Sequence, residues 1–354
     1  MSAQSSSWKV YRLPGGVSLR FDQRVPWVIG ALLLATLAVL AICVSVGEYP
    51  IPLADVVGTL LGRAEGARYE FVILQLRLPR AVLAWLVGAA LATSGGIIQG
   101  LTRNPLASPD LTGVTAGASA AAVTLIILLP FVSSSVLPLA AFGGGLLVAA
   151  LLYLLAWRNT GDAGGDSPIR LILIGIGLSA VMGAYTSYAL TFGDLWHVQK
   201  AMMWLAGSVY AASWTDVSVV LPWIVVCLPL AAFSARDLNA LNLGQEVAQG
   251  LGLPLSLKRG FLLLLAVALA AITVTVAGII GFVGLIAPHV ARRMVGPLYE
   301  GVIPTSALSG GFLVLLADLM GRSLFSPIEI PAGIIIALVG VPFFLYLLWK
   351  REKI

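Results

Sequence analysis

Residues 25–47 read VPWVIGALLLATLAVLAICVSVG, a run without a single charged side chain. Three more uncharged runs of similar length occupy residues 81–102, 171–193 and 217–235. A helix needs about 20 residues to cross the hydrocarbon layer of a membrane, which is roughly 30 Å thick. Lipid offers no partner to backbone N–H and C=O groups, so each run must form a helix or belong to a closed barrel.

The composition favours helices over barrel strands. Of the 354 residues, 59% are hydrophobic and only 10% are charged, whereas a soluble domain carries about 25% charged residues. Barrel strands alternate over segments of about ten residues, but these runs are longer and apolar on every face. The net charge of +5 comes from basic residues that flank the apolar runs, which indicates membrane topology rather than a nucleic-acid partner.

We expect ten transmembrane helices. Their predicted ranges are residues 27–47, 80–101, 112–130, 136–157, 168–192, 217–235, 258–279, 281–297, 302–322 and 331–349. Pro130 and Pro138 separate the third span from the fourth, because proline ends or interrupts a helix. The glycines within residues 278–284 separate the seventh span from the eighth.

An even number of spans places both ends of the chain on one side of the membrane. With the N-terminus in the cytoplasm, all but six of the 21 Lys and Arg residues fall on cytoplasmic segments, as the positive-inside rule requires. Residues 25–47 are too long for a signal peptide and have no clear cleavage site, so we interpret them as a retained span. This topology makes residues 1–26 and 351–354 cytoplasmic, 27–350 the transmembrane domain, 48–79 a periplasmic loop and 236–257 a cytoplasmic loop.

Two segments of the chain repeat. Residues 138–148 (PLAAFGGGLLV) match 304–314 (PTSALSGGFLV), and residues 96–98 match 278–280, both GII. On the expected topology the matched helices run in opposite directions, which is typical of an inverted repeat in a transporter. Chance similarity between glycine-rich apolar helices is the alternative.

The sequence has no motor of its own. None of the five lysines follows a glycine, so the phosphate-binding loop GxxxxGK[ST] is absent. Residues 308–312 (LSGGF) resemble an ATPase signature but lie inside an apolar span. Cys43 and Cys227 fall in apolar runs, and His197 and His289 are too far apart for a metal site. We therefore predict no catalytic residue, no metal site and no cofactor.

The cytoplasmic loop 236–257 contains the pattern Glu246-x-Ala248-x-x-x-Gly252. Glutamate and alanine early in a segment and glycine at its end favour a short helix with a glycine stop. Such a helix, held between two transmembrane spans, can bind another protein and transmit that protein's movement to the spans. An ordinary connecting loop is the alternative.

Residues 28–349 resemble the FecCD-type permeases of ATP-binding-cassette (ABC) importers for ferric siderophores, haem and vitamin B12. The matching pieces are 77–80 (RLPR) with 87–91 (VGAAL), Gln99 with 104–110 (NPLASPD), 243–244 (LG), 281–289 (GFVGLIAPH) with 292–293 (RR), and 317–318 (AD) with 330–333 (IPAG). Residues 156–159 (AWRN) and 173–177 (LIGIG) are most similar to the ferric enterobactin branch.

The resemblance implies an all-α, type II importer permease that moves a ferric siderophore, catecholate by preference, across the bacterial inner membrane. It implies four kinds of partner: an ABC ATPase dimer, a periplasmic substrate-binding protein, a second permease that is identical or homologous, and the lipid bilayer. It assigns coupling to the ATPase to Leu243, Gly244, Glu246, Ala248 and Gly252. The Ile-x-Leu-Pro segment of the broader importer pattern is missing after this glycine.

The resemblance also assigns receptor docking to Arg77, Arg80 and Arg322, because a guanidinium group forms a bidentate fork for carboxylates. Interfacial anchoring to lipid headgroups is the alternative explanation for these arginines.

Helix breaks are predicted at two polar positions that would line the pathway. These positions are Asn104 with Pro105, and Pro288 with His289.

Three rival functions remain open on the residues alone. Vitamin B12 or haem could replace the siderophore as cargo. A secondary transporter driven by an ion gradient would need an intramembrane carboxylate, and Asp318 is the only candidate. We expect Asp318 and His289 to cap helices or bond between them rather than to relay protons. A membrane scaffold would move no solute at all.

Overall fold

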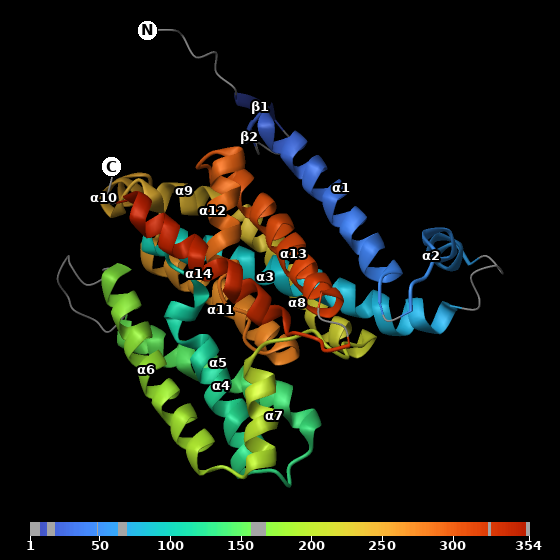
Figure 1. Cartoon of the computed structure of the whole chain (residues 1–354). Helices are drawn as coiled ribbons and strands as arrows, with labels where there is room; N and C mark the ends of the chain where they lie inside the picture. Colours follow the sequence, from blue (N-terminus) through green and yellow to red (C-terminus); the bar gives the residue numbers. More distant parts are fainter. Residues whose placement is uncertain are drawn as a thin grey trace.

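The computed structural model describes residues 8–12, 18–47, 49–62, 69–156, 168–324 and 327–351. Helices dominate these residues (Figure 1). Their bounds are α1 Arg24–Ser45, α2 Leu53–Leu60, α3 Leu78–Thr102, α4 Val114–Val123, α5 Leu137–Ala156, α6 Pro168–Phe192, α7 Leu195–Leu205, α8 Trp214–Phe233, α9 Ala235–Asn242, α10 Gln245–Gly250, α11 Leu255–Ala277, α12 Val283–Val295, α13 Tyr299–Ser323 and α14 Ala332–Arg351. Shorter helical turns are η2 Val72–Arg77, η3 Pro109–Thr112, η4 Thr124–Leu128 and η5 Ser134–Val136.

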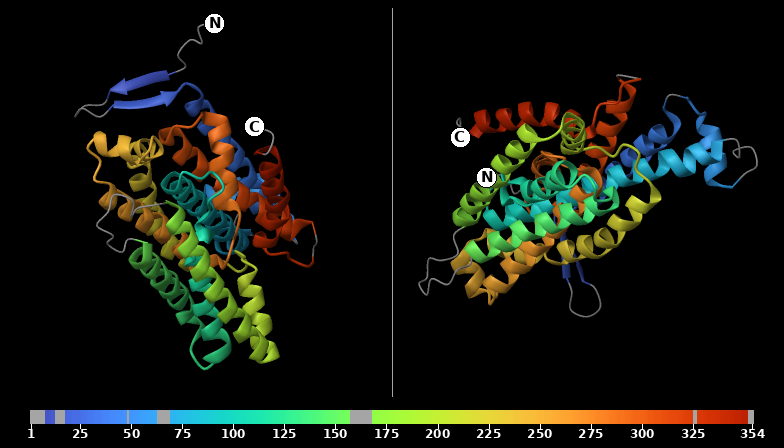
Figure 2. Two further views of the ribbon diagram at one scale, coloured as in Figure 1. Left: turned by 90° about the vertical axis from the view of Figure 1, so that its left-hand side faces the viewer. Right: turned by 90° about the horizontal axis from the view of Figure 1, so that it is seen from below.

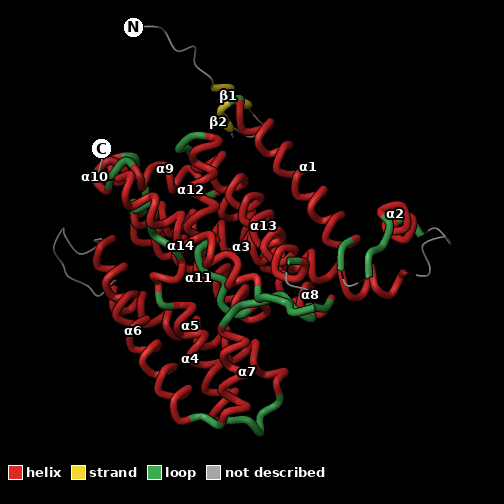
Figure 3. The backbone as a smooth tube through the Cα atoms, viewed as in Figure 1, coloured by secondary structure: helices red, strands yellow, loops and turns green. Residues whose placement is uncertain are grey.

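Eight helices in the described residues are long and apolar enough to cross a membrane. The shorter apolar helix Val114–Leu128, formed by α4 and η4, and the 13-residue α12 lie at the other two predicted spans. Each of the ten predicted spans overlaps one of these helices, so the all-α polytopic fold is confirmed. The described residues also contain one non-helical element, an antiparallel hairpin before α1. In this hairpin β1 (Trp8–Arg12) pairs with β2 (Ser18–Asp22) (Figure 3).

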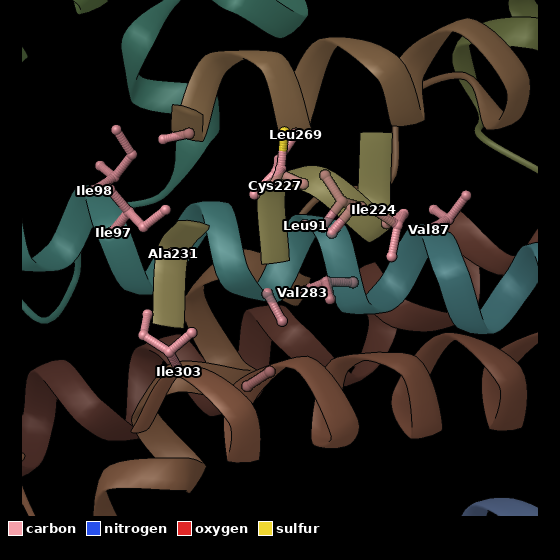
Figure 4. Close-up of a cluster of buried hydrophobic side chains, with 14 of the residues drawn as sticks. Val87, Leu91, Ile97, Ile98, Ile224, Cys227, Ala231, Leu269, Val283 and Ile303 are labelled. Carbon is pink, nitrogen blue, oxygen red and sulfur yellow. The ribbon is translucent and has the colours of Figure 1, made fainter. Parts of the chain in front are cut away.

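Helix α3 forms the centre of the bundle. The apolar window of the span Val72–Thr102 is 89% buried, against 11% for the span Arg170–Phe192 in α6. Side chains from α8, α11, α12 and α13 pack around α3 (Figure 4). A helix that is apolar and buried all round cannot face lipid, so the other helices must supply the lipid-facing surface.

Glycines bring α3 close to two of its neighbours. A Cβ atom on Gly95 would overlap the carbonyl group of Gly284 in α12, and one on Gly88 would overlap that of Gly310 in α13. Small residues at such crossings let backbones touch directly, which is how membrane helices gain packing energy without a hydrophobic driving force. The packing is therefore tight enough for α3 to move together with α12 and α13.

The two halves of the bundle share one order of helix lengths. In α3–α6 and again in α11–α14, a short helix follows the first long one and two long helices come after it. Both short helices begin after a residue with left-handed backbone geometry, Gly113 (φ 80°) and Phe282 (φ 64°). Pro138 and Pro304 lie in the matching helices α5 and α13, which supports the repeat.

The second sequence match behaves differently from the first. Residues 96–98 lie inside α3, whereas residues 278–280 follow the end of α11. That match therefore does not mark equivalent positions. The opposite direction of the two halves stays a prediction.

The bundle has two polar ends, which we name by their residues. The "coupling end" holds α9, α10 and Tyr299, and the "arginine end" holds Arg77, Arg80 and Arg322. Tyr299 begins α13 and Asp318 lies near its other end, about 28 Å away at 1.5 Å per residue. Figures 1 and 2 show the hairpin, the C-terminal end of α14 and α9–α10 toward the same end of the molecule.

Candidate functional site

The predicted coupling residues form a short helix with glycines at both ends. Leu243 is the C-cap of α9, and Gly244 (φ 112°) is the N-cap of α10. Glu246 lies in the first turn of α10, Ala248 is fully buried, and Gly252 (φ 81°) follows the last turn. These positive φ angles favour glycine, because a Cβ atom is strained there. The predicted helix with a glycine stop is confirmed.

An exposed apolar stripe, which the sequence analysis did not identify, is formed by one residue of α10 and the C-cap residues of α9 and α10. Leu243, Val247 and Leu251 are 65%, 48% and 66% exposed and lie four residues apart. Val247 lies within α10, but Leu243 precedes the non-helical Gly244 and Leu251 caps the end of α10, so the three do not share one helix face. An apolar row on a short polar segment is a typical protein-binding surface. Counting leucine and valine at this period would have revealed it.

Helix α9 connects the α10 segment to the bundle through an ion pair and hydrogen bonds. Lys258 at the start of α11 forms a 2.7 Å ion pair with Asp237. The backbone N–H of Tyr299 donates to Asn239 Oδ1 at 3.0 Å, and Asn239 Nδ2 donates to Glu300 Oε2 at 2.5 Å. Helix α9 is therefore bonded directly to both α11 and α13.

A polar chain, buried at Tyr299 and Gln99, continues from there to the central helix. The Tyr299 hydroxyl interacts electrostatically with Arg292 in α12 and with Asn242 in α9. Arg292 Nη2 donates to Gln99 Oε1 in α3, and Gln99 is only 2% exposed. Four helices thus share one polar network, which we call the "Gln99 network" (Gln99, Asn242, Arg292 and Tyr299). Networks of this kind fix a single packing arrangement when every member is satisfied.

The predicted helix break at Pro288 is wrong. Helix α12 continues through Pro288 and His289 to Val295. Proline has no N–H for the carbonyl of the residue four positions earlier, which here is Gly284. Gln99 Nε2 donates to that carbonyl oxygen at 3.2 Å. The side chain of α3 supplies the missing bond, so the helix need not break.

The break at Asn104 and Pro105 is confirmed. Helix α3 ends at Thr102, and Arg103 takes the left-handed conformation (φ 49°). Asn104 Oδ1 then accepts a hydrogen bond from the Leu106 N–H at 3.0 Å. A role of these residues in a pathway stays a prediction.

His289 lies in α12 with its ring edge-on to Phe343, at a centroid distance of 5.7 Å. A role for His289 in a pathway also stays a prediction.

Replacing Gln99 with leucine should cost about 1–3 kcal/mol of stability, because the Gly284 carbonyl and the Arg292 guanidinium would lose a buried partner. The measurement is the unfolding midpoint of the purified chain in detergent. Gln75→Leu is the matched control, because Gln75 is exposed and should change the midpoint little. Equal midpoints for both variants would contradict the network.

At the arginine end, Arg80 forms ion pairs with two carboxylates. Its Nη2 lies 2.9 Å from Asp318 Oδ1 and 2.9 Å from Glu329 Oε2, and its Nε donates to both Asp318 oxygens at 3.1 Å. Asp318 is 3% exposed, so this bidentate pair joins α3 to α13 inside the bundle. The predicted bonding of Asp318 between helices is confirmed.

The other two arginines cap the end of α1. Arg77 Nη1 donates to the carbonyls of Val44 and Ser45 at 2.8 and 2.9 Å, and Arg322 Nη2 donates to that of Cys43. The last carbonyls of a helix have no partner within it, so cations stabilise that end.

The internal contacts leave little of these arginines exposed to solvent. The side chains of Arg80 and Arg322 are 12% and 8% exposed, and Arg77 is half-buried. Receptor docking by these residues stays a prediction.

The described residues contain no group of three His, Cys, Asp or Glu side chains arranged for a metal ion. Cys43 and Cys227 are buried free thiols in α1 and α8. The candidate enterobactin motif at residues 156–159 extends outside the described residues.

Comparison with known proteins matches residues 33–350 to the FecCD transport family. The achromobactin transport system permease protein CbrC of Dickeya dadantii is 45% identical over 92% of both chains. The iron(3+)-hydroxamate import system permease protein FhuG of Bacillus subtilis is 43% identical over 81% of this chain and 86% of its own length. A solved inward-facing structure of a metal-chelate type ABC transporter covers 92% of this chain and 99% of its own, with 31% identity and a TM-score of 0.81.

Proposed function

The chain belongs to the FecCD transport family and is a permease of an ABC importer for metal chelates, and from this premise we propose that it imports a ferric siderophore, catecholate by preference, from the periplasm to the cytoplasm. Partner subunits hydrolyse the ATP. The observation that carries the proposal is the exposed stripe Leu243, Val247 and Leu251 in and beside α10. A chain without a phosphate-binding loop needs such a surface to receive force from a motor.

The coupling end is cytoplasmic in this proposal. An ABC ATPase dimer grips α10, with Glu246 at the rim of the contact and Ala248 buried against the bundle. Force passes through Asn239 and Asp237 into α13 and α11, and through the Gln99 network into α3. Because α13 reaches both ends of the bundle, one displacement can alter access at both membrane faces.

The arginine end is periplasmic and meets the substrate-binding protein. All three arginines are partly accessible to solvent. A receptor carboxylate reaching Arg80 would compete with Glu329, which is 35% exposed, and not with buried Asp318. Docking would then release the segment that carries Glu329. A second permease, identical or homologous, completes the pathway within the inner membrane.

The proposed cargo is based on the family and on a local sequence resemblance. The relatives CbrC and FhuG are named for two different substrates, achromobactin and iron(3+)-hydroxamate, so the family alone leaves the cargo open. Vitamin B12 and haem remain the alternative cargoes. Catecholate is preferred because the sequence resembles the ferric enterobactin branch at residues 173–177.

Reconstituted vesicles test the proposed function. We expect vesicles that contain the permease, its ATPase and a loaded receptor to take up a ferric catecholate only when ATP is present. The rival function, a secondary transporter, predicts uptake driven by a proton or sodium gradient without ATP. Gradient-driven uptake in vesicles that lack the ATPase would overturn the proposal.

A further inference from the structure

A cavity of about 800 Å³ opens beside the arginine end. Its walls come from α7, from the loop that follows α7, from the C-terminal end of α11 and from the segment 327–331. Ligand sites usually measure about 300–1,000 Å³ and combine apolar walls with a few polar groups. The size of the cavity therefore suits a single bulky solute.

One face of α7 lines this cavity. Trp196, Lys200 and Met203 lie four and three residues apart along the helix, which places them on the same side. Trp204 and Tyr210 add two more aromatic rings. Trp196 and Tyr210 are 78% and 66% exposed, so much of each ring is open to a ligand.

The cavity has one uncompensated positive charge. Glu329, the acidic residue of the lining, is paired with Arg80 at 2.9 Å. Arg80 also pairs with Asp318, and Arg322, 3.9 Å from Asp318, supplies the second positive charge that balances the two carboxylates. The Arg80 guanidinium also lies over the Tyr210 ring, 5.7 Å from its centroid. Lys200 has no ion-pair partner among the residues that the structure describes. A ligand with negative charge and flat rings would satisfy both the lysine and the aromatic walls.

Backbone bonds fix the walls in place. The Ser208 N–H donates to the Ala277 carbonyl at 2.7 Å, and the Gly333 N–H donates to the Gly207 carbonyl at 3.0 Å. A Cβ atom on Gly207 would overlap the carbonyl of Ile279. These contacts join the loop after α7 to the ends of α11 and α14. The cavity is therefore formed before any ligand arrives, which lowers the entropic cost of binding.

A membrane interface offers another reason for exposed tryptophans, because aromatic and basic side chains anchor proteins at headgroup level. Anchoring alone does not require the rings and the lysine to face one cavity whose acidic residue is already neutralised. The two explanations differ in what they predict for soluble ligands.

We propose that this cavity receives a ferric catecholate after the receptor releases it. Three doubly charged catecholate groups around Fe³⁺ leave a net negative charge that Lys200 would pair with, and their rings would stack on Trp196, Trp204 and Tyr210. This inference rests on the proposed function and adds the residues that recognise the cargo. Citrate complexes share the negative charge but lack the rings.

Equilibrium dialysis of the purified full chain in lipid nanodiscs tests this site. The probes are radioactive iron(III) complexed with catechol or with citrate. We expect tighter binding of the catechol complex, and we expect Lys200→Gln and Trp196→Ala each to weaken it about three- to tenfold. Trp27→Ala is the matched control, because Trp27 is 83% exposed on α1, and its binding should equal that of the unaltered chain.

Three results would overturn the site. They are equal binding of the two complexes, unchanged binding in both cavity variants, and an equal loss in Trp27→Ala, which would indicate interfacial anchoring. Vesicle uptake separates this failure from failure of the proposed function. Full catecholate uptake by both cavity variants rejects the cavity alone, whereas absence of ATP-driven uptake of any ferric chelate by the unaltered chain rejects the function.

Discussion

Aspartate in place of Leu243, Val247 and Leu251 is expected to abolish ATP-driven uptake. Each side chain is about half exposed or more, so none of them supports the core and the variant should fold. Anchoring residues of an interface contribute about 2 kcal/mol or more each, and a charge buried there without a partner adds a further penalty. Association with the ATPase should weaken by more than roughly a hundredfold.

Copurification with the ATPase and uptake into vesicles check this prediction. Gln249→Asp is the control, because Gln249 is exposed on α10 but is not part of the stripe. It should keep both activities. Ala248→Asp should instead prevent folding, because Ala248 is fully buried. Normal uptake by the triple aspartate variant would contradict the assignment of α10 as the coupling helix.

The second large effect concerns Arg80. Arg80→Leu should lower the free energy of unfolding by about 3–5 kcal/mol, because it leaves Asp318, 3% exposed, without its bidentate partner. The second arginine near this carboxylate, Arg322, is 3.9 Å away and already donates to a carbonyl of α1. It cannot replace the lost bonds without giving up that cap. Titration with a denaturing detergent measures the change.

A double variant separates the ion pair from other effects of Arg80. Arg80→Leu combined with Asp318→Leu removes both charges and should recover most of the lost stability, because a buried pair exchanged for apolar residues is often neutral. Lys258→Leu is the control at the partly exposed pair with Asp237 and should cost about 0–1 kcal/mol. Equal losses in the Arg80 and Lys258 single variants would contradict the structural role of Arg80.

The spans of this fold could be predicted because lipid imposes a simple rule on sequence. Charge-free runs such as 171–193 end within a few residues of the observed helix α6. The short coupling helix could be predicted equally well from the sequence, because Gly244 and Gly252 mark its two ends. In both cases the signal is local in the sequence.

Contacts between distant residues could not be predicted in the same way. Arg80 and Asp318 are 238 positions apart, and no local pattern links them. Pro288 was predicted to break a helix because the hydrogen bond that compensates for the missing N–H comes from Gln99, which lies in another helix. Helix α7 was missed because its mixture of Trp196, Lys200 and apolar residues resembles a loop, although Asp194 caps its first turn.

The structure connects the two ends of the molecule through its central helices. The coupling end is bonded to α13 and to α3, and α13 and α3 are joined again by Arg80 and Asp318. Glycine contacts hold the same helices close together between the two ends. A continuous series of contacts of this kind can transmit a displacement over about 28 Å without any motor in the chain itself.

A distance across the molecule tests this central claim most directly. Spin labels are attached at Gln249→Cys in α10 and Leu195→Cys in α7, because both positions are exposed. The background substitutions Cys43→Ala and Cys227→Ala remove the native thiols. With the ATPase present, ATP should shift the distance between the labels, and the triple aspartate variant should show no shift. An unchanged distance on ATP addition, or the same shift in the triple variant, would contradict the account.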